Sequence, residues 1–537
     1  ALQSNVYDVL VIGGGITGAG IALDAASRGL KTALIEKNDF AYGTSSRSTK
    51  LIHGGLRYLK QLEFGLVKEV GSERAVVHKL APHLVIPEKM LLPLFEKKGF
   101  GYWLTAVGLT IYDWLAGVKA ADRRRMLTRN KTFKHEPLLK GTDLKGGALY
   151  AEYRTDDARL TLAVIKTAHN HGGVVASYVL AENFLYDQYQ QVYGVIARDT
   201  LNNTSFAIQA RCVVNAAGPW VDDLRAINNS KTGKHLHLTK GVHIVVPHAR
   251  LPVQQAIYFD ADDGRMIFAI PREGTTYIGT TDTHYHASPD DVLTTRDDVQ
   301  YLLQAVNNMF PSITLSMADV QSSWAGLRPL IHEAGKSASE LSRKDEIFES
   351  PSGLISIAGG KLTGYRKMAE RVVNMVQRRL GKPVTPCRTD SIMLSGSAFD
   401  SAEAVKQYIG TIARQLAPHG FSTHTAAYLV HNYGSDTTLV IAAFNRQSHA
   451  DADTRLALAE LDYGFAHEMT LTPHDFFIRR TGMLYFDIQR MQKLIAPVLG
   501  VFTQRFAYSA DMYNTMRHAL LAEMERAAVF KHEQTGV

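Results

Sequence analysis

The chain contains very little cysteine: its 537 residues include only Cys212 and Cys387, and no Cys-x-x-Cys pair occurs. A disulfide framework, a thiol-exchange centre and a cysteine-based metal site are therefore excluded. Internal repeats and low-complexity tracts are also absent. With 45% apolar residues and a net charge of only +7, the composition is that of a globular protein, and the length suits about two to four domains.

Long apolar runs are scarce, and only residues 100–118 come near the length of a membrane span. This run carries one charge, Asp113, and as a helix rising about 1.5 Å per residue it would reach roughly 28 Å. Its glycines, its aspartate and its aromatics favour a buried or an interfacial helix over a true span. Cations beside it would suit an anionic membrane surface: Lys97, Lys98, Lys119, Arg123, Arg124 and Arg125.

The N-terminal residues and the net charge suggest a location for the protein and the classes of its partners. Residues 1–8 show neither a basic segment nor a cleavage site, so we expect no secretory signal and a cytoplasmic location. An isoelectric point near 9.1 leaves nucleic acid, an anionic membrane or an anionic substrate as partners. Because no basic stripe interleaved with aromatics and no nucleic-acid module is visible, we expect no nucleic-acid partner.

The order of apolar runs predicts an α/β protein. The chain opens with an apolar run at 6–12, a glycine turn, a helical segment at 16–28 and a second apolar run at 32–35. Further apolar runs lie at 174–175, 192–197, 212–217, 243–246, 277–278 and 354–358. This spacing predicts a parallel dinucleotide-binding sheet interrupted by an antiparallel domain. From about Ser401 the sequence becomes rich in Ala and Leu at helical spacing, which predicts a helical C-terminal domain.

A dinucleotide-binding fingerprint stands at the first turn. Gly13, Gly15 and Gly18 are spaced as Gly-x-Gly-x-x-Gly between the predicted strand and helix, and Glu36 follows the second strand. The glycines permit a tight turn, close approach of a pyrophosphate and tight packing of helix on strand. Glu36 would bind a ribose diol and repel a 2′-phosphate, which leaves NAD or FAD. A second fingerprint is absent, which disfavours flavin enzymes with a separate NADPH domain.

Seven segments together resemble one enzyme family, the FAD-dependent glycerol-3-phosphate dehydrogenases. They cover most of the chain in order: GTSSRSTKLIHGGLRYL (43–59), NAAGPWVD (215–222), KGVHIVVP (240–247), IPREGTTYIGTTDT (270–283), WAGLRPL (324–330), IAGGKLTGYRKMAE (357–370) and DFFIRRTG (475–482). The resemblance implies a glutathione-reductase-like, Rossmann-type FAD-binding domain, an antiparallel-sheet substrate domain like that of D-amino-acid oxidases, and an α-helical C-terminal domain. The expected boundaries are 1–78, 148–240 and 331–385 for the FAD domain, 79–147 and 241–330 for the substrate domain, and 386–537 for the helical cap.

The family reaction oxidises sn-glycerol 3-phosphate at C2 to dihydroxyacetone phosphate and reduces FAD, whose electrons pass to a membrane quinone. An α-glycerophosphate oxidase, which uses oxygen, is the alternative, and an amino-acid or amine oxidase of the same fold is a more distant one. We expect a homodimer held at the inner face of the cell membrane by an anionic lipid surface. No metal is expected.

The substrate is a dianionic phosphate, which arginine and lysine recognise best. The family motifs assign this role to Arg57, Arg328 and Lys361, with Tyr58 and Thr363 as hydroxyl donors beside them. Arg328 and Lys361 could also stabilise the alkoxide, leaving the proton to water.

For the general base the sequence offers His243, His53 and His332. A histidine titrates near working pH, and His243 lies at the strand that should cover the flavin, so it is the preferred base. His53 is expected to pack near the flavin ring.

The expected FAD contacts come from the same motifs, and no histidine or cysteine stands where a covalent flavin link would form. Non-covalent FAD is therefore expected. The contact residues are Gly13, Gly15, Gly18, Glu36, Ser45, Ser46, Gly55, Val179, Ala216, Gly218, Gly360, Lys361, Leu362 and Thr363. Residues 359–363 should begin a helix whose N–H groups face the flavin and stabilise its reduced form.

Overall fold

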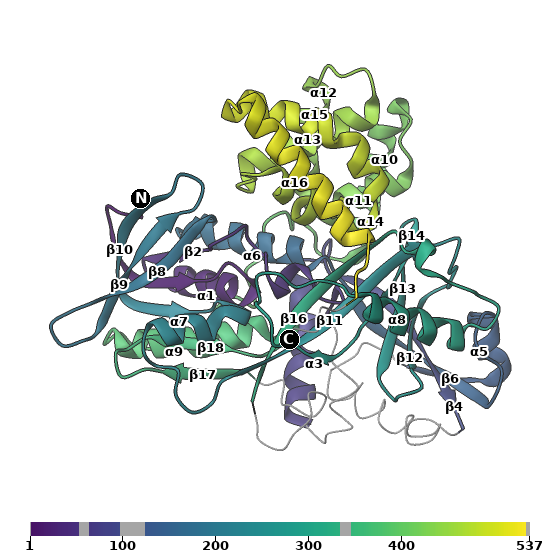
Figure 1. The fold of residues 1–537 in the computed structure, drawn as a ribbon, viewed down its shortest axis with the longest axis horizontal. Helices are drawn as coiled ribbons and strands as arrows, with labels where there is room; N and C mark the ends of the chain where they lie inside the picture. The colour runs from purple at the N-terminus through teal and green to yellow at the C-terminus, as the bar shows by residue number, and fades with distance from the viewer. Residues whose placement is uncertain (1, 53–63, 97–123, 333–344, 533–537) are drawn as a thin grey trace.

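A computed structural model describes residues 2–52, 64–96, 124–332 and 345–532 of the chain. Two sheets lie side by side, and a bundle of helices from the C-terminal third covers them from above (Figure 1). Because consecutive stretches of the chain alternate between the two sheets, residues far apart in sequence meet where the sheets adjoin.

The first sheet has the order β17-β18-β10-β1-β2-β7, and its central pairs run parallel. Its strands are β1 (Val6–Ile12), β2 (Thr32–Ile35), β7 (Val174–Ala176), β8 (Val179–Tyr186), β9 (Val192–Asp199), β10 (Thr204–Asn215), β17 (Glu346–Glu349) and β18 (Ile355–Ala358). Helices α1 (Ile16–Ser27), α6 (Asp157–Asn170) and α9 (Tyr365–Arg379) contribute buried apolar residues to one common core with the sheet. Strands buried on both faces explain the near-continuous apolar runs of β1 and β2.

The second sheet is mostly antiparallel, with the order β15-β11-β14-β13-β12-β4-β6-β3. Its strands are β3 (Leu51–Ile52), β4 (Ile86–Phe95), β5 (Arg125–Thr128), β6 (Leu144–Arg154), β11 (Leu236–Pro247), β12 (Ala256–Asp260), β13 (Met266–Arg272), β14 (Thr275–Gly279), β15 (Thr283–His284) and β16 (Ser322–Ile331). The amphipathic helix α8 (Arg296–Met309) packs its apolar side into the core of this sheet. Helices α3 (Phe64–Leu80), α5 (Arg129–His135) and α7 (Val221–Ile227) fill the connections.

The C-terminal third is helical from α10 onward. Its helices are α10 (Ala402–Leu416), α11 (Thr423–Tyr433), α12 (Thr437–Arg446), α13 (Ala452–His467), the π-helix η8 (Asp475–Arg480), α14 (Met483–Phe486), α15 (Ile488–Phe506) and α16 (Ala510–Ala528). The start of α10 follows the predicted change near Ser401 by one residue. The expected α/β class, with a Rossmann-type sheet, an antiparallel second sheet and a helical C-terminal domain, is confirmed.

Buried ion pairs join the helical domain to the first sheet. Asp39, which lies just after β2, accepts from Arg479 and, at 2.7 and 2.8 Å, from Arg480 of η8. Arg159 of α6 makes a two-pronged bond of 2.7 and 2.8 Å to Glu468. All five side chains are buried. Because a buried charge left without its partner is costly, these pairs fix how the cap sits.

Two of the sequence predictions concern a domain boundary and a possible membrane segment. The boundary expected after residue 147 falls inside β6, whose residues pair with β4 along its whole length. The apolar run at 100–118 lies outside the described residues. Among the helices that are described, none is long and apolar enough to cross a membrane.

Candidate functional site

The glycine turn between β1 and α1 has the backbone that its sequence predicts. Gly13 adopts a positive φ of 116°, and a β-carbon there would lie 2.5 Å from the Ala216 carbonyl oxygen. A β-carbon at Gly18 would lie 1.9 Å from the carbonyl oxygen of Gly13. Only glycine fits at both positions, so the N-terminus of α1 stays open to an anion.

Glu36 and Ser45 fix the two sides of this turn. The Glu36 carboxylate accepts the N–H of Gly14 at 2.7 Å and the N–H of Asn38 at 2.9 Å. Ser45 Oγ accepts the Ile16 N–H at 2.9 Å. Burial raises the pKa of Glu36, although these two bonds act against the rise. Each carboxylate oxygen still has a lone pair that a ribose hydroxyl could use.

The next residues fit a bound dinucleotide. Ser46 is buried, and its hydroxyl makes no hydrogen bond within the described part of the chain. An unpaired buried hydroxyl is costly, and a cofactor atom would satisfy it. The Val179 N–H donates to the Glu36 carbonyl at 2.8 Å, which places this strand beside the ribose-binding acid. Gly218, with a positive φ of 56°, begins the short helix after β10.

A second glycine turn follows β18. Gly360 has a positive φ of 78°, and a β-carbon there would lie 2.5 Å from Met368 Sδ. Lys361 caps a short 3-10 helix, Leu362–Gly364, which runs directly into α9. Thr363 is buried at this point. The structure therefore places a helix start where the sequence expected one.

His243 lies in the middle of β11 and is 1% exposed. Its ring stacks on Trp324 with a centroid distance of 4.8 Å, and its Nε2 lies 3.0 Å from Thr49 Oγ1. On the other face, a β-carbon at Gly279 would lie 2.1 Å from the ring. Burial, together with the charges of Arg328 and Lys50, holds the pKa of His243 well below its usual value.

Arg328 projects from β16 beside the same strand. It donates to Thr280 Oγ1 at 3.0 Å and to Asp282 Oδ1 at 3.2 Å. A β-carbon at Gly241 would lie 2.3 Å from the guanidinium, so that glycine makes room for it. Arg328 is only partly buried, which suits a cation that meets a ligand.

Sequence reasoning missed a buried network of charges behind His243. Lys50 donates to Asp157 at 2.5 Å and lies 3.7 Å from Asp156, which also pairs with Arg272 at 3.2 Å. The Lys50 ammonium also lies 5.8 Å from the ring of Trp324. The adjacent Asp156 and Asp157 stand among other charged residues of the 151–160 segment, so the sequence offered no clear signal that they are paired inside the protein.

Several of the predicted residues are not among those that the structure places at this site. Gly55, Arg57, Tyr58 and His53 lie outside the described residues. His332 follows β16 at an exposed position and stacks on His235, with a centroid distance of 4.5 Å. His332 thus lies on an exposed edge, whereas His243 is buried in the sheet.

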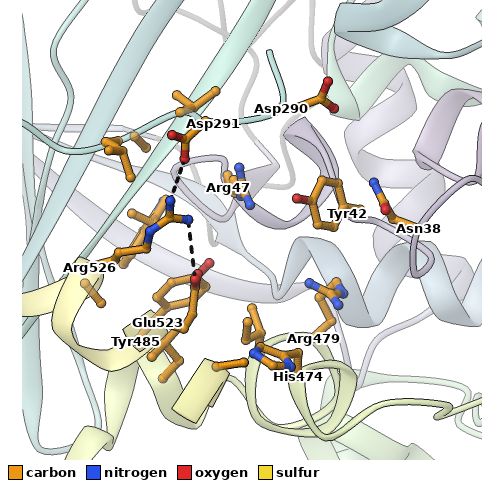
Figure 2. Close-up of a pocket in the computed structure, with 18 of the residues that line it drawn as sticks. Asn38, Tyr42, Arg47, Asp290, Asp291, His474, Arg479, Tyr485, Glu523 and Arg526 are labelled. Atoms are coloured by element: carbon orange, nitrogen blue, oxygen red, sulfur yellow. Dashed lines mark hydrogen bonds and ion pairs between the residues drawn. The ribbon is translucent and has the colours of Figure 1, made fainter. Parts of the chain in front are cut away.

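A separate cavity of about 340 Å³ opens between the loop after β2, β16 and the C-terminal helices (Figure 2). Arg526 bridges one side by pairing with Asp291 at 3.0 Å and with Glu523 at 4.0 Å. Trp324, Tyr485 and Arg47 line it as well. Because Trp324 also stacks on His243, this ring separates the cavity from the buried histidine.

Comparison with known proteins identifies relatives along nearly the whole chain. Residues 8–366 match the family model of FAD dependent oxidoreductases, and residues 387–512 match the C-terminal domain of alpha-glycerophosphate oxidase. The aerobic glycerol-3-phosphate dehydrogenase of Bacillus subtilis is 48% identical, covering 96% of this chain and 94% of its own length. Its counterpart in Staphylococcus aureus strain USA300 is 47% identical over 95% and 92%. The solved glycerol-3-phosphate dehydrogenase of Bacillus halodurans, complexed with FAD, is 45% identical, covers 99% of this chain and 97% of its own, and superposes with a TM-score of 0.85.

Proposed function

The chain belongs to the FAD-dependent aerobic glycerol-3-phosphate dehydrogenases, and from this membership we propose how its own residues share the oxidation of glycerol 3-phosphate. The resemblance, the enzyme class and the FAD requirement inferred from sequence are confirmed. Bound FAD supplies the acceptor for the C2 hydride. The protein must hold the phosphate, take up the hydroxyl proton and exclude water. The observation that carries the assignment of roles is that His243 and Arg328, on the paired strands β11 and β16, both contact the 279–280 segment.

We assign phosphate recognition to Arg328, with Lys361, Thr363, Arg57 and Tyr58. Arg328 supports this role because its guanidinium is partly exposed and already held by neutral and acidic oxygens of the 280–282 segment. A phosphate dianion can compete with those partners, since two parallel N–H donors match its oxygens. Arg328 and Lys361 would also stabilise negative charge on the substrate oxygen as its proton leaves.

We assign to His243 the role of accepting the proton of the substrate hydroxyl. Its lowered pKa keeps the imidazole neutral near pH 7, which is the form that accepts a proton. The nearby charges of Arg328 and Lys50 oppose that protonation in the free protein. A bound phosphate dianion would offset them, so the base becomes stronger when the substrate is present. Thr49 holds the Nε2 side of the ring in place.

We propose that FAD contacts the glycine turn, Ser45, Ser46, Val179 and the start of α9, held without a covalent bond. The N-terminal N–H groups of α1 suit the pyrophosphate, and Glu36 suits the ribose. The second turn, at Gly360, leads through a short 3-10 helix into α9, whose first residue, Tyr365, packs against Gly20 of α1.

The electron acceptor is proposed to be a membrane quinone, with the protein a homodimer bound peripherally at the cytoplasmic face of an anionic membrane. Support comes from the relatives' description as aerobic dehydrogenases and from the basic residues around 97–125. Oxygen is the second candidate, because the C-terminal helices match a domain described for an oxidase.

A single anaerobic experiment tests both parts. Glycerol 3-phosphate should bleach the flavin absorbance of the purified protein, and a quinone analogue should then restore it faster than oxygen does. Failure to bleach contradicts the substrate assignment. Faster recovery with oxygen selects the oxidase. Retention on anionic vesicles at low salt, lost at high salt, tests the membrane contact separately.

A further inference from the structure

Five histidines cluster where β11 begins, beside β15 and the end of β16. His235 and His237 come from the start of β11, His284 and His286 from β15 and the residues after it, and His332 follows β16. Four of them are exposed and His237 is half-buried. Each ring lies near at least one other ring of the group, at centroid distances from 4.5 to 6.4 Å. Neither the glycine turns nor the reaction requires this concentration of imidazoles.

The central pair is held by the sheet itself. β15 pairs with β11 so that His284 lies opposite Thr239, two residues from His237. His237 Nε2 and His284 Nδ1 are 2.6 Å apart. Two nitrogens on one tetrahedral zinc, each at about 2.0–2.1 Å from the metal, would be about 3.3 Å apart. A small rotation of either ring would turn this hydrogen bond into a chelate.

A third imidazole stands within reach. The ring of His286 lies 6.4 Å from those of both His237 and His284. Rings that share a tetrahedral zinc have centroids about 5 Å apart, so His286 would need to approach by roughly 1 Å. Among the described residues, no group of three or more His, Cys, Asp or Glu side chains is placed so that it could hold a metal ion without movement. His237 and His284 are therefore already in place, and the exposed His286 would have to move to complete the site.

We propose that His237, His284 and His286 form a site for a divalent late transition metal, with Zn²⁺ as the cation to test. Imidazole suits Zn²⁺, Ni²⁺ and Cu²⁺, whereas Mg²⁺ and Ca²⁺ prefer oxygen ligands. The exposed rim lets the ion enter from solvent.

The site adjoins a residue of the reaction. Asp282, two residues before His284, pairs with Arg328 at 3.2 Å. A metal that links β15 to β11 would hold Asp282 against Arg328, and a phosphate would then compete less well. This consequence rests on the proposed role of Arg328, whereas metal binding does not.

Equilibrium dialysis of the untagged FAD-bound enzyme against Zn²⁺, read by metal analysis, tests the site. We expect one Zn²⁺ per chain, with Mg²⁺ and Ca²⁺ failing to compete. Affinity should fall about tenfold or more in H237A/H284A. Because His237 is half-buried, H284A/H286A, at two exposed positions, provides a second variant that should retain the fold. The matched control is H171A/H518A, which removes two exposed histidines elsewhere.

Equal zinc binding by the wild type and H284A/H286A, or no binding by either, would overturn the site. In a second arm, saturating Zn²⁺ should raise the KM for glycerol 3-phosphate in the wild type and leave it unchanged in H284A/H286A. An unchanged KM with zinc bound overturns the coupling to Arg328 alone. An enzyme inactive towards glycerol 3-phosphate without zinc contradicts the proposed function instead, since the dialysis result is independent of turnover.

Discussion

At the scale of single residues, the site is defined by what surrounds one imidazole. His243 lies between Trp324 on one face and the bare backbone of Gly279 on the other, with Thr49 at its Nε2 edge. The ring therefore has little freedom to leave this position. A buried neutral histidine fixed in this way has the fixed position that the proposed general base requires.

Replacing His243 with Ala should lower kcat by roughly 10² or more, because general base catalysis typically contributes that much. Stopped-flow flavin reduction would measure it, with bound FAD checked by absorbance. His248→Ala, at the end of the same strand, is the matched control and should keep normal turnover. Full turnover in a His243→Ala protein that retains FAD would rule the base out.

Gly279→Ala tests the ring's position without removing it. The added β-carbon would lie 2.1 Å from His243, so the ring must move and kcat should fall while FAD remains bound. Gly274→Ala lies in the same region, where a β-carbon meets nothing within 4 Å, and should have little effect. Equal kcat in the two variants would show that the ring position is unimportant.

At the scale of elements, the π-helix η8 is the contact that locks the cap to the first sheet. Arg479 and Arg480 both reach Asp39, and all three side chains are almost fully buried. Although burial raises it, the charges of Arg480 and Arg479 hold the pKa of Asp39 below its usual value. The carboxylate is therefore ionised and paired at neutral pH.

Asp39→Ala should lower the free energy of unfolding by about 3–5 kcal/mol, because it removes the carboxylate that two buried guanidinium groups share. Among the described residues, Arg479 would keep only Asp475 as an acidic partner, and Arg480 would keep only Glu468. Urea unfolding followed by circular dichroism would measure the change. Asp290→Ala removes an exposed partner of Lys37 and should cost no more than about 1 kcal/mol. Similar losses in both variants would mean that burial of the Asp39 pairs is not what stabilises the cap.

The sequence predicted the elements of the FAD turn closely, for a local reason. Gly13, Gly18 and Glu36 lie within one β-α-β unit, where their spacing in the sequence alone determines which residues come into contact. β6 was divided by an expected boundary because its pairing with β4 joins segments about 60 residues apart, and neither segment signals its partner. The ion pairs of η8 escaped notice for the same reason: Asp39 and Arg480 are 441 residues apart.

At the scale of the whole molecule, we expect two histidines, the buried His83 and the half-buried His431, to make stability depend on pH. His83 precedes β4, and its carbonyl lies 2.9 Å from Nδ1 of His431 in the cap. Burial, aided by the charge of His431, lowers the pKa of His83 to about 3, and burial lowers that of His431 to about 4. The unfolded chain therefore binds more protons than the folded protein below about pH 6.5.

The free energy of unfolding should fall as pH drops from 6.5 toward 5, by up to about 1.4 kcal/mol per pH unit for each histidine. Urea midpoints at several pH values would show this slope. His431→Gln should reduce it, whereas His171→Gln, at an exposed position, should not. Parallel slopes for all three proteins would place the dependence on other groups.

FAD should stabilise the whole fold reversibly. At free FAD about 100 times its Kd, unfolding should cost about 2.7 kcal/mol more than in the apoprotein. Denatured protein should release all its flavin through a filter. Flavin that stays with the polypeptide would contradict non-covalent binding.

By itself, the sequence determined the fold class, the dinucleotide turn and the family, because these depend on local spacing and on motifs. Only the tertiary structure decided that His243 is buried and neutral, that Lys50 joins Asp156, Asp157 and Arg272 behind it, and that five histidines meet on one rim. Such contacts depend on sheet register and cap docking, which bring distant segments together, and the pKa of each group follows from the neighbours that it acquires.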